Sequence, residues 1–132
     1  MRNWVVGLLA AAVLTMAPVG SRQVEASAYP WGLCTWWAAA MRPDIGYSIS
    51  GNARSWGRAA AAAGFRVDGY PTVGAIAVFQ PGVQGAWGLG HVAYVTAVGT
   101  RSWFQVSEMD FPYAGRVTYR WARTGWGVTF IH

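Results

Sequence analysis

The stretch of sequence that decides the fold is YPWGLCTWWAAAM, residues 29–41. Its Pro and Gly residues end an extended segment, and the Ala-rich run 35–41 has the composition of a short helix. Cys34 therefore falls in the first turn of the predicted helix. Free backbone N–H groups and the positive end of the helix dipole lie there, and both stabilise a thiolate. The stretch thus predicts a prepared nucleophile at the start of a helix.

The residues before this stretch are typical of a secretory signal peptide. Arg2 gives a positive start, residues 4–19 carry no charge, and residues 26–28 have the small side chains that signal peptidase reads. An apolar run of about 16 residues is shorter than the roughly 20 that span a bilayer. We therefore expect a cleaved signal at 1–28, one mature domain at 29–132, and export to the periplasm or the cell exterior. An uncleaved membrane anchor is the alternative.

Export gives Cys34, the single cysteine of the chain, a special meaning. Exported proteins usually pair their cysteines, so an odd one indicates an intermolecular bridge or a free reactive thiol. The alternative is a small buried apolar side chain with no chemical role.

The composition is that of one folded domain with few charges. Of the 132 residues, 54% are hydrophobic and 11% are charged, which excludes a disordered chain and a coiled coil. All ten basic residues are arginines, and they are scattered along the chain rather than gathered in the stripe of a nucleic-acid reader. We therefore expect no nucleic-acid partner, although a net charge of +5 favours anionic polymers in general.

The pattern downstream changes from helix to strand. A second helix is predicted over 50–64, where an alanine run ends at a glycine. Short β-rich runs bounded by Gly, Pro or polar residues follow. The sequence predicts an α+β fold, with N-terminal helices packed on a mostly antiparallel sheet of about five strands. These strands are expected at 75–79, 92–98, 102–108, 117–121 and 127–131.

The two central predicted strands bring a histidine and a carboxylate together. If Gly99 and Thr100 form a two-residue loop, antiparallel pairing places His91 directly opposite Glu108. Opposed residues share a face about 5 Å apart at Cβ, which permits a hydrogen bond between the side chains. Asp110 lies on the same face and is a second candidate for orienting the ring. A three-residue loop would shift the register by one and separate the pair.

A cysteine, a histidine and an acidic side chain together match the chemistry of a thiol hydrolase. The thiolate attacks a carbonyl carbon, the imidazolium protonates the leaving amine, and the carboxylate fixes the orientation of the imidazole. Each residue also has a simpler interpretation, since a histidine can be a loop residue and carboxylates can be strand-end charges. The coincidence of all three favours the catalytic interpretation.

Five stretches in order along the chain form a pattern that is typical of one known family. They are YPWGLCTWW (29–37), GNARSW (51–56), PTVGAI (71–76), GHVAYV (90–95) and VSEMD (106–110). With these stretches the sequence resembles the CHAP family, the cysteine, histidine-dependent amidohydrolases and peptidases of bacterial cell-wall metabolism. The resemblance implies a papain-like α+β fold over residues 29–132. It also implies that Cys34 is the nucleophile, His91 the general acid/base and Glu108 its orienting partner.

Two positions depart from the pattern of many family members. Leu33 stands where a glutamine often precedes the nucleophile, and Asp110 stands in place of an asparagine. The backbone N–H of Cys34 can supply one oxyanion donor, and the Tyr29 hydroxyl is a candidate for the second, with a packed aromatic as the alternative. An aspartate at position 110 adds negative charge beside His91, which would raise the pKa of the imidazole.

Several tryptophans are candidates for lining a substrate groove by stacking, although each could instead belong to the core. The glycine-rich segment 82–90 is interpreted as a flexible wall of that groove. Neither histidine lies in a metal-ligand cluster, so no metal and no cofactor are expected. The candidate groove residues are Trp31, Trp37, Trp56 and Trp87.

We therefore expect a secreted peptidoglycan hydrolase that cleaves an amide bond through a thiolate nucleophile. The bond would lie at the glycan–peptide junction, as for an N-acetylmuramoyl-L-alanine amidase, or within the peptide, as for an endopeptidase. A peptide-cleaving effector is one alternative. A non-catalytic wall-binding or scaffold protein that retains the fold is another. Peptidoglycan is the expected partner, and removal of the signal would leave no membrane insertion.

Overall fold

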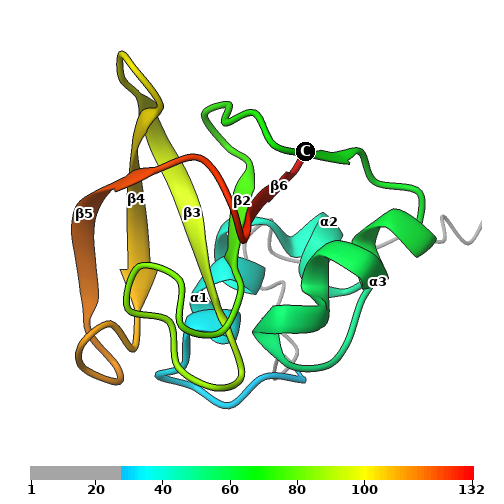
Figure 1. The fold of residues 1–132 in the computed structure, drawn as a ribbon. Helices are drawn as coiled ribbons and strands as arrows, with labels where there is room; N and C mark the ends of the chain where they lie inside the picture. Colours follow the sequence, from blue (N-terminus) through cyan, green and yellow to red (C-terminus); the bar gives the residue numbers. More distant parts are fainter. Residues whose placement is uncertain (1–27) are drawn as a thin grey trace, which may run out of the picture.

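Helices precede most of the sheet in the chain and pack against one of its faces (Figure 1). The structure is a computed structural model that describes residues 28–132. The predicted signal segment therefore lies outside the described residues, except for Ala28. Within the described part of the chain, no helix is both long enough and apolar enough to cross a membrane.

The predicted first helix is present and begins one residue earlier than expected. Helix α1 spans Cys34–Met41, so Cys34 is its first residue. A short α2, Pro43–Gly46, follows with a proline at its start and was not predicted. The helix predicted over 50–64 is a 3₁₀ turn, Ala53–Ser55, that continues into α3, Trp56–Ala62.

The sheet has six strands, one more than predicted, and every neighbouring pair in it is antiparallel. The missed strand is the two-residue β1, which pairs with the last strand, β6. In space the order is β1-β6-β2-β3-β4-β5. The strands are β1 (Val67–Asp68), β2 (Ile76–Phe79), β3 (His91–Val98), β4 (Trp103–Met109), β5 (Val117–Arg123) and β6 (Val128–Ile131).

The register predicted between β3 and β4 is wrong. The backbone N–H of Gly99 donates to the Trp103 carbonyl at 2.8 Å, so the loop between them has three residues rather than two. Two residues of this loop, Arg101 and Ser102, have positive φ angles of 53° and 72°. A β-bulge between Val95 and Ala97 then shifts the pairing by one residue in the opposite sense.

Beyond the bulge the net displacement is two residues, and because that number is even, His91 and Glu108 stay on one face as predicted. Tyr94 pairs with Ser107, and the same register continued places Glu108 opposite Ala93. Glu108 is therefore a diagonal neighbour of His91. Diagonal Cβ atoms lie roughly 7–8 Å apart, within reach of two long side chains.

Apolar side chains fill both faces of the sheet. On the helix side, Trp56 and Ile45 are fully buried against Ile76 and Val92. The interpretation of Trp56 as a groove residue is therefore wrong, because its ring belongs to this core. A second cluster on the other face contains the rings of Phe79, Phe104 and Phe130. His91 and Glu108 extend from β3 and β4 beside this second cluster.

Candidate active site

Cys34 occupies the first position of α1, and its thiol is free and half-buried. The preceding residue, Leu33, has an extended backbone, and no side chain caps the helix. The N–H groups of the first turn are therefore not occupied by a capping side chain. They remain available to a developing oxyanion, and the positive end of the helix favours negative charge on the sulfur.

The turn that leads into Cys34 is held by the loop between β4 and β5. The N–H of Gly115 donates to the carbonyl of Gly32 at 2.9 Å. A Cβ atom on Gly115 would lie 2.7 Å from the ring of Trp31, so only glycine fits beneath this tryptophan. Gly32 itself has a φ of +95°, a conformation that glycine adopts readily. The position of the thiol therefore depends on this contact.

His91, the first residue of β3, forms a buried pair with Glu108 on β4. Nε2 of His91 lies 2.7 Å from Oε1 of Glu108, and the two residues are 4% and 0% exposed. The rings of Phe79 and Phe111 pack on the imidazole, with centroid distances of 5.9 Å and 5.3 Å. Because Glu108 occupies Nε2, Nδ1 is the nitrogen left for Cys34.

The surroundings of His91 favour its protonated form. Burial alone would lower the pKa of the imidazole, but hydrogen bonds to Cys34 and Glu108, together with their negative charges, raise the pKa above its ordinary value. An imidazolium beside the sulfur is the acid that a thiol hydrolase needs for its leaving group. The structure thus brings Cys34, His91 and Glu108 together.

Arg120 on β5 is a member of the site that the sequence reasoning missed. Its Nε donates to both oxygens of Glu108, at 2.7 Å and 3.1 Å. On β5 it lies two residues beyond Thr118, the partner of Glu108, and it therefore shares the face of Glu108. A charged residue in the middle of a predicted strand was the available signal, since a buried carboxylate needs a cation.

A cleft of about 740 Å³ opens at this site, and Glu108 lies outside its lining. Cys34 and His91 lie in its lining, and Trp87 and Leu89 form part of the wall from the segment before β3. Trp87 is 82% exposed. This placement supports the prediction that the glycine-rich segment is a groove wall, with Trp87 available to stack on a substrate.

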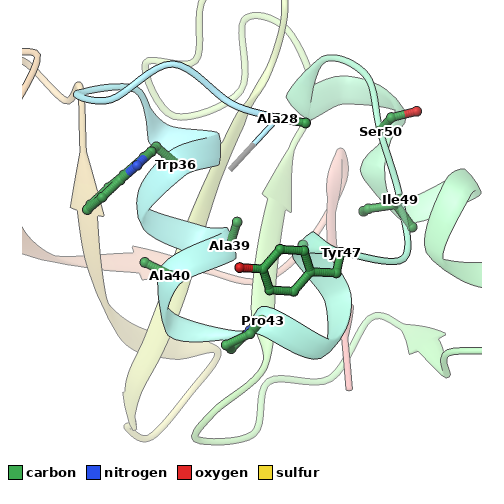
Figure 2. Close-up of a pocket in the computed structure, with 9 residues that line it drawn as sticks. Ala28, Trp36, Ala39, Ala40, Pro43, Tyr47, Ile49 and Ser50 are labelled. Atoms are coloured by element: carbon green, nitrogen blue, oxygen red, sulfur yellow. The ribbon is translucent and has the colours of Figure 1, made fainter. Parts of the chain in front are cut away.

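A second cavity, of about 340 Å³, lies elsewhere and is mainly apolar. Side chains of α1, of α2 and of the residues after α2 surround it, among them Trp36, Pro43, Tyr47 and Ile49 (Figure 2). None of the predicted site residues lines this cavity. The candidate residues Cys34 and His91 therefore lie at the larger cleft and not at this cavity.

Two further candidates have structural partners. The hydroxyl of Tyr29 donates to the Ile49 carbonyl at 2.8 Å, and its ring packs on Trp56. Its proton is thus directed to a backbone carbonyl rather than to an oxyanion, although Tyr29 borders the cleft. The indole of Trp37 donates to the Ser107 hydroxyl at 3.1 Å and is not part of the cleft lining. Trp37 therefore joins α1 to β4 and is not a groove residue.

Trp31 and Asp110 are placed differently from these. Trp31 is 68% exposed and covers Gly115 outside the cleft lining. Asp110 does line the cleft, in a left-handed conformation with a φ of 59°. Nε2 of His91 is bound by Glu108, so Glu108, and not Asp110, occupies the orienting position. Among residues 28–132, no three His, Cys, Asp or Glu side chains gather as metal ligands would.

Known proteins resemble this chain over the region of the cleft. A family model described as the CHAP domain matches residues 24–110. The N-acetylmuramoyl-L-alanine amidase sle1 of Staphylococcus haemolyticus is 45% identical over 96 residues, which are 70% of this chain and 28% of that protein. The sle1 amidase of Staphylococcus aureus strain USA300 is 41% identical over 107 residues, 78% of this chain and 30% of that protein.

Solved structures of other proteins have a similar fold. A crystal structure of an N-acetylmuramoyl-L-alanine amidase from Staphylococcus aureus has a TM-score of 0.67 at 27% identity, over 79% of this chain and 31% of the other. The structure of Ly7917 with the hydrolysing product of MDP has a TM-score of 0.53 at 20% identity, over 76% of this chain and 53% of the other, and shows the fold alone. The papain-like α+β fold is thus confirmed. The chain spans less than a third of the length of the curated relatives named above.

Proposed function

The chain belongs to the CHAP domain family, and on that premise we propose that it is a cysteine-dependent hydrolase that cleaves an amide bond of peptidoglycan. One observation carries the proposal. His91, which is paired with the buried Glu108, lines the same cleft as the free thiol of Cys34 at the start of a helix. This is the arrangement that covalent thiol catalysis requires.

In the proposed reaction, the sulfur of Cys34 attacks the carbonyl carbon of the amide. The backbone N–H groups at the start of α1 receive the negative oxygen of the tetrahedral intermediate. His91 donates its Nδ1 proton to the amide nitrogen, the C–N bond breaks, and the amine leaves. Water then attacks the thioester while Nδ1 accepts one of its protons, which releases the acid and restores the thiol. Glu108 holds the ring at Nε2 throughout.

The bond that we propose joins N-acetylmuramic acid to L-alanine. The names of the relatives from Staphylococcus support this choice over cleavage within the peptide. The exposed ring of Trp87 on the cleft wall supplies a platform on which a sugar or a peptide can stack.

We also propose that the enzyme acts outside the cytoplasm, because its substrate lies there and because residues 1–28 have the pattern of a cleaved signal. N-terminal sequencing of the secreted protein tests this expectation directly. Tyr29 is expected as the first residue. Secreted protein that still begins with residues of the apolar run would contradict cleavage.

Digestion of purified peptidoglycan, followed by mass spectrometry of the products, tests the proposed reaction. The protein should release peptides that begin with L-alanine, and Cys34→Ala should release none while its circular dichroism is unchanged. His132→Gln is the matched control, since His132 lies outside the cleft lining. Equal release by Cys34→Ala would eliminate the thiol mechanism. New termini within the peptide would replace the amidase by an endopeptidase, and binding without any product would support a scaffold.

A further inference from the structure

The carboxylate of Glu108 has two hydrogen-bond partners, His91 and Arg120. Its Oε1 accepts from His91 and from Arg120, and its Oε2 accepts from Arg120 at 2.7 Å. The proposed mechanism uses only the bond to His91. Arg120 is therefore a part-buried charged contact of the site to which no role has yet been given.

We propose that Arg120 is a positioning residue that keeps Glu108 ionised and oriented while His91 changes its protonation state. The proposal rests on the proposed function, because it concerns the step in which the imidazole has lost its proton. Arg120 acts through Glu108 and is not one of the residues that line the cleft.

The charges of the buried groups explain the need for such a residue. With His91 protonated, the imidazolium balances the carboxylate of Glu108. Once His91 has given its proton to the leaving amine, Glu108 is a fully buried carboxylate beside a neutral ring. A buried carboxylate with no cation nearby readily binds a proton. The guanidinium of Arg120, which is always charged, prevents this.

Protonation of Glu108 would disable the base. A carboxylate accepts the proton on Nε2 of His91 and so leaves Nδ1 free to take a proton from water. A carboxylic acid instead donates to Nε2, and the ring proton then moves to Nδ1, the nitrogen that must act as the base. The tautomer of His91 thus depends on the charge of Glu108, and that charge depends on Arg120.

The fixed setting of the guanidinium supports this role. It lies 3.9 Å from the ring centroid of Phe111 and 5.0 Å from that of Phe79, and these two rings also pack on His91. Its Nη2 is buried and has no hydrogen-bond partner in the described part of the chain. An arginine with a purely structural role normally has its buried donors hydrogen-bonded. The unbonded Nη2 therefore indicates that the positive charge of Arg120 serves the site.

Arg120 also has a structural contact, which the test must separate from the charge. Its Nη1 donates to the carbonyl of Gln84 at 2.8 Å. The side chain of Gln84 in turn bonds both backbone groups of Arg123, at 2.7 Å and 2.9 Å. The segment that carries Trp87 is therefore joined to β5 twice. Gln84→Ala removes the side-chain bonds of Gln84 alone and serves as the matched control.

The test compares how activity depends on pH in Arg120→Met, Arg120→Lys and Gln84→Ala. The charged or titratable groups that face the pair are Cys34 from α1, Arg120 from β5 and Asp110 from the loop after β4. Arg120→Met removes the cation that contacts Glu108, so the acid limb of kcat/KM should move to higher pH. At pH 6 the loss should exceed that at pH 8 by about tenfold, which corresponds to a shift of one pH unit.

The two other variants should keep the acid limb of the unmodified protein. Arg120→Lys retains the positive charge, and Gln84→Ala retains the whole of Arg120, although either variant can lower kcat. An unshifted limb in Arg120→Met would overturn the proposal. An equal shift in Gln84→Ala would assign the effect to the cleft wall. Should Arg120→Met fail to fold, a shifted limb in Arg120→Lys would itself contradict the charge argument.

A second measurement needs no peptidoglycan. The rate at which iodoacetamide alkylates Cys34 reports the thiolate–imidazolium pair, and at pH 6 it should fall about tenfold in Arg120→Met but not in Gln84→Ala. If the two variants differ in alkylation in this way and the unmodified protein nevertheless leaves peptidoglycan intact, the proposed function fails while the role of Arg120 stands. An unchanged rate in Arg120→Met at pH 6 would refute that role alone.

Discussion

Two histidines of the chain have nearly the same hydrogen-bond geometry and very different surroundings. Nε2 of His91 lies 2.7 Å from a carboxylate oxygen of Glu108, and Nε2 of His132 lies 2.8 Å from one of Asp68. In both pairs an arginine stands beside the carboxylate. Bond lengths alone therefore do not distinguish the catalytic candidate from the other histidine.

What differs is the group on Nδ1 and the exposure of the carboxylate. Nδ1 of His132 lies 2.8 Å from the Thr72 hydroxyl, whereas His91 has the Cys34 thiol beside it. The side chain of Glu108 is 1% exposed and that of Asp68 is 27% exposed. A histidine–carboxylate pair can therefore act in catalysis only when it is buried beside a nucleophile.

The largest expected difference between the two histidines is in activity. His91→Gln removes the proton carrier and should lower the rate of peptidoglycan hydrolysis by about 10⁴-fold, since members of a catalytic triad act as a unit. His132→Gln should leave the rate unchanged within about twofold. The release of soluble product from labelled cell walls measures both. Comparable losses in the two variants would remove the distinction on which the site assignment depends.

The next difference is in the stability that each carboxylate, Glu108 or Asp68, contributes to the fold. Glu108→Gln leaves the part-buried guanidinium of Arg120 without its charged partner, which should lower the free energy of unfolding by up to about 3–5 kcal/mol. Asp68→Asn breaks contacts near the surface and should cost less than about 1 kcal/mol. Urea unfolding followed by tryptophan fluorescence gives both values. A larger loss in Asp68→Asn would mean that Glu108 is not a buried charge.

The response to pH should have opposite signs in the two pairs. The pKa of His91 is raised, so its stabilising contribution is complete below the ordinary value of about 6.5 and is lost as the pH rises through the higher native value. The pKa of Asp68 is lowered, first by the N–H of Tyr70 and then by His132, so its contribution is lost as the pH falls below the ordinary carboxyl range.

Melting temperatures of His91→Gln and Asp68→Asn, measured against the unmodified protein from pH 4 to 9, test these signs. The decrease in melting temperature caused by His91→Gln should become smaller toward high pH, and the decrease caused by Asp68→Asn should become smaller toward low pH. A deficit of His91→Gln that grows with rising pH would contradict the direction given for the imidazole.

The smallest expected effect is that of replacing Asp110, the carboxylate in the cleft lining. Asp110→Asn should change the hydrolysis rate by no more than about twofold, because Glu108 already binds Nε2 of the ring. Glu108→Gln should lower it by about 10²-fold or more, the range of an impaired acid/base group. The reverse order of these rates would reassign the orienting role to Asp110.

Local patterns in the sequence were sufficient for most of the fold. The start of α1, the alanine-rich helix and five of the strands follow from Pro, Gly and β-branched residues that any reader can find. The two-residue strand β1 has no pattern of its own, since it exists only through its pairing with β6. Such a strand depends on tertiary contacts and could not be predicted locally.

The site was predicted for a reason that was only partly right. The pairing of His91 and Glu108 was expected from a two-residue loop, and the structure reaches it through a longer loop and a compensating bulge at Thr96. Because the net shift in register is an even number of residues, the side chains of His91 and Glu108 remain on one face of the sheet. Arg120 was missed because its partner is diagonal on the neighbouring strand. Diagonal pairing depends on sheet twist and side-chain length, which a list of strands does not contain.

The most direct test of the catalytic assignment is a nuclear magnetic resonance titration of the protein carrying ¹⁵N-labelled histidine. His91 should titrate above about 6.5, its neutral ring should carry the proton on Nε2, and Cys34→Ala should lower its pKa toward the ordinary value. His132 provides the second signal for comparison. A His91 ring that titrates below 6.5, or whose neutral form is protonated on Nδ1, would contradict the catalytic assignment.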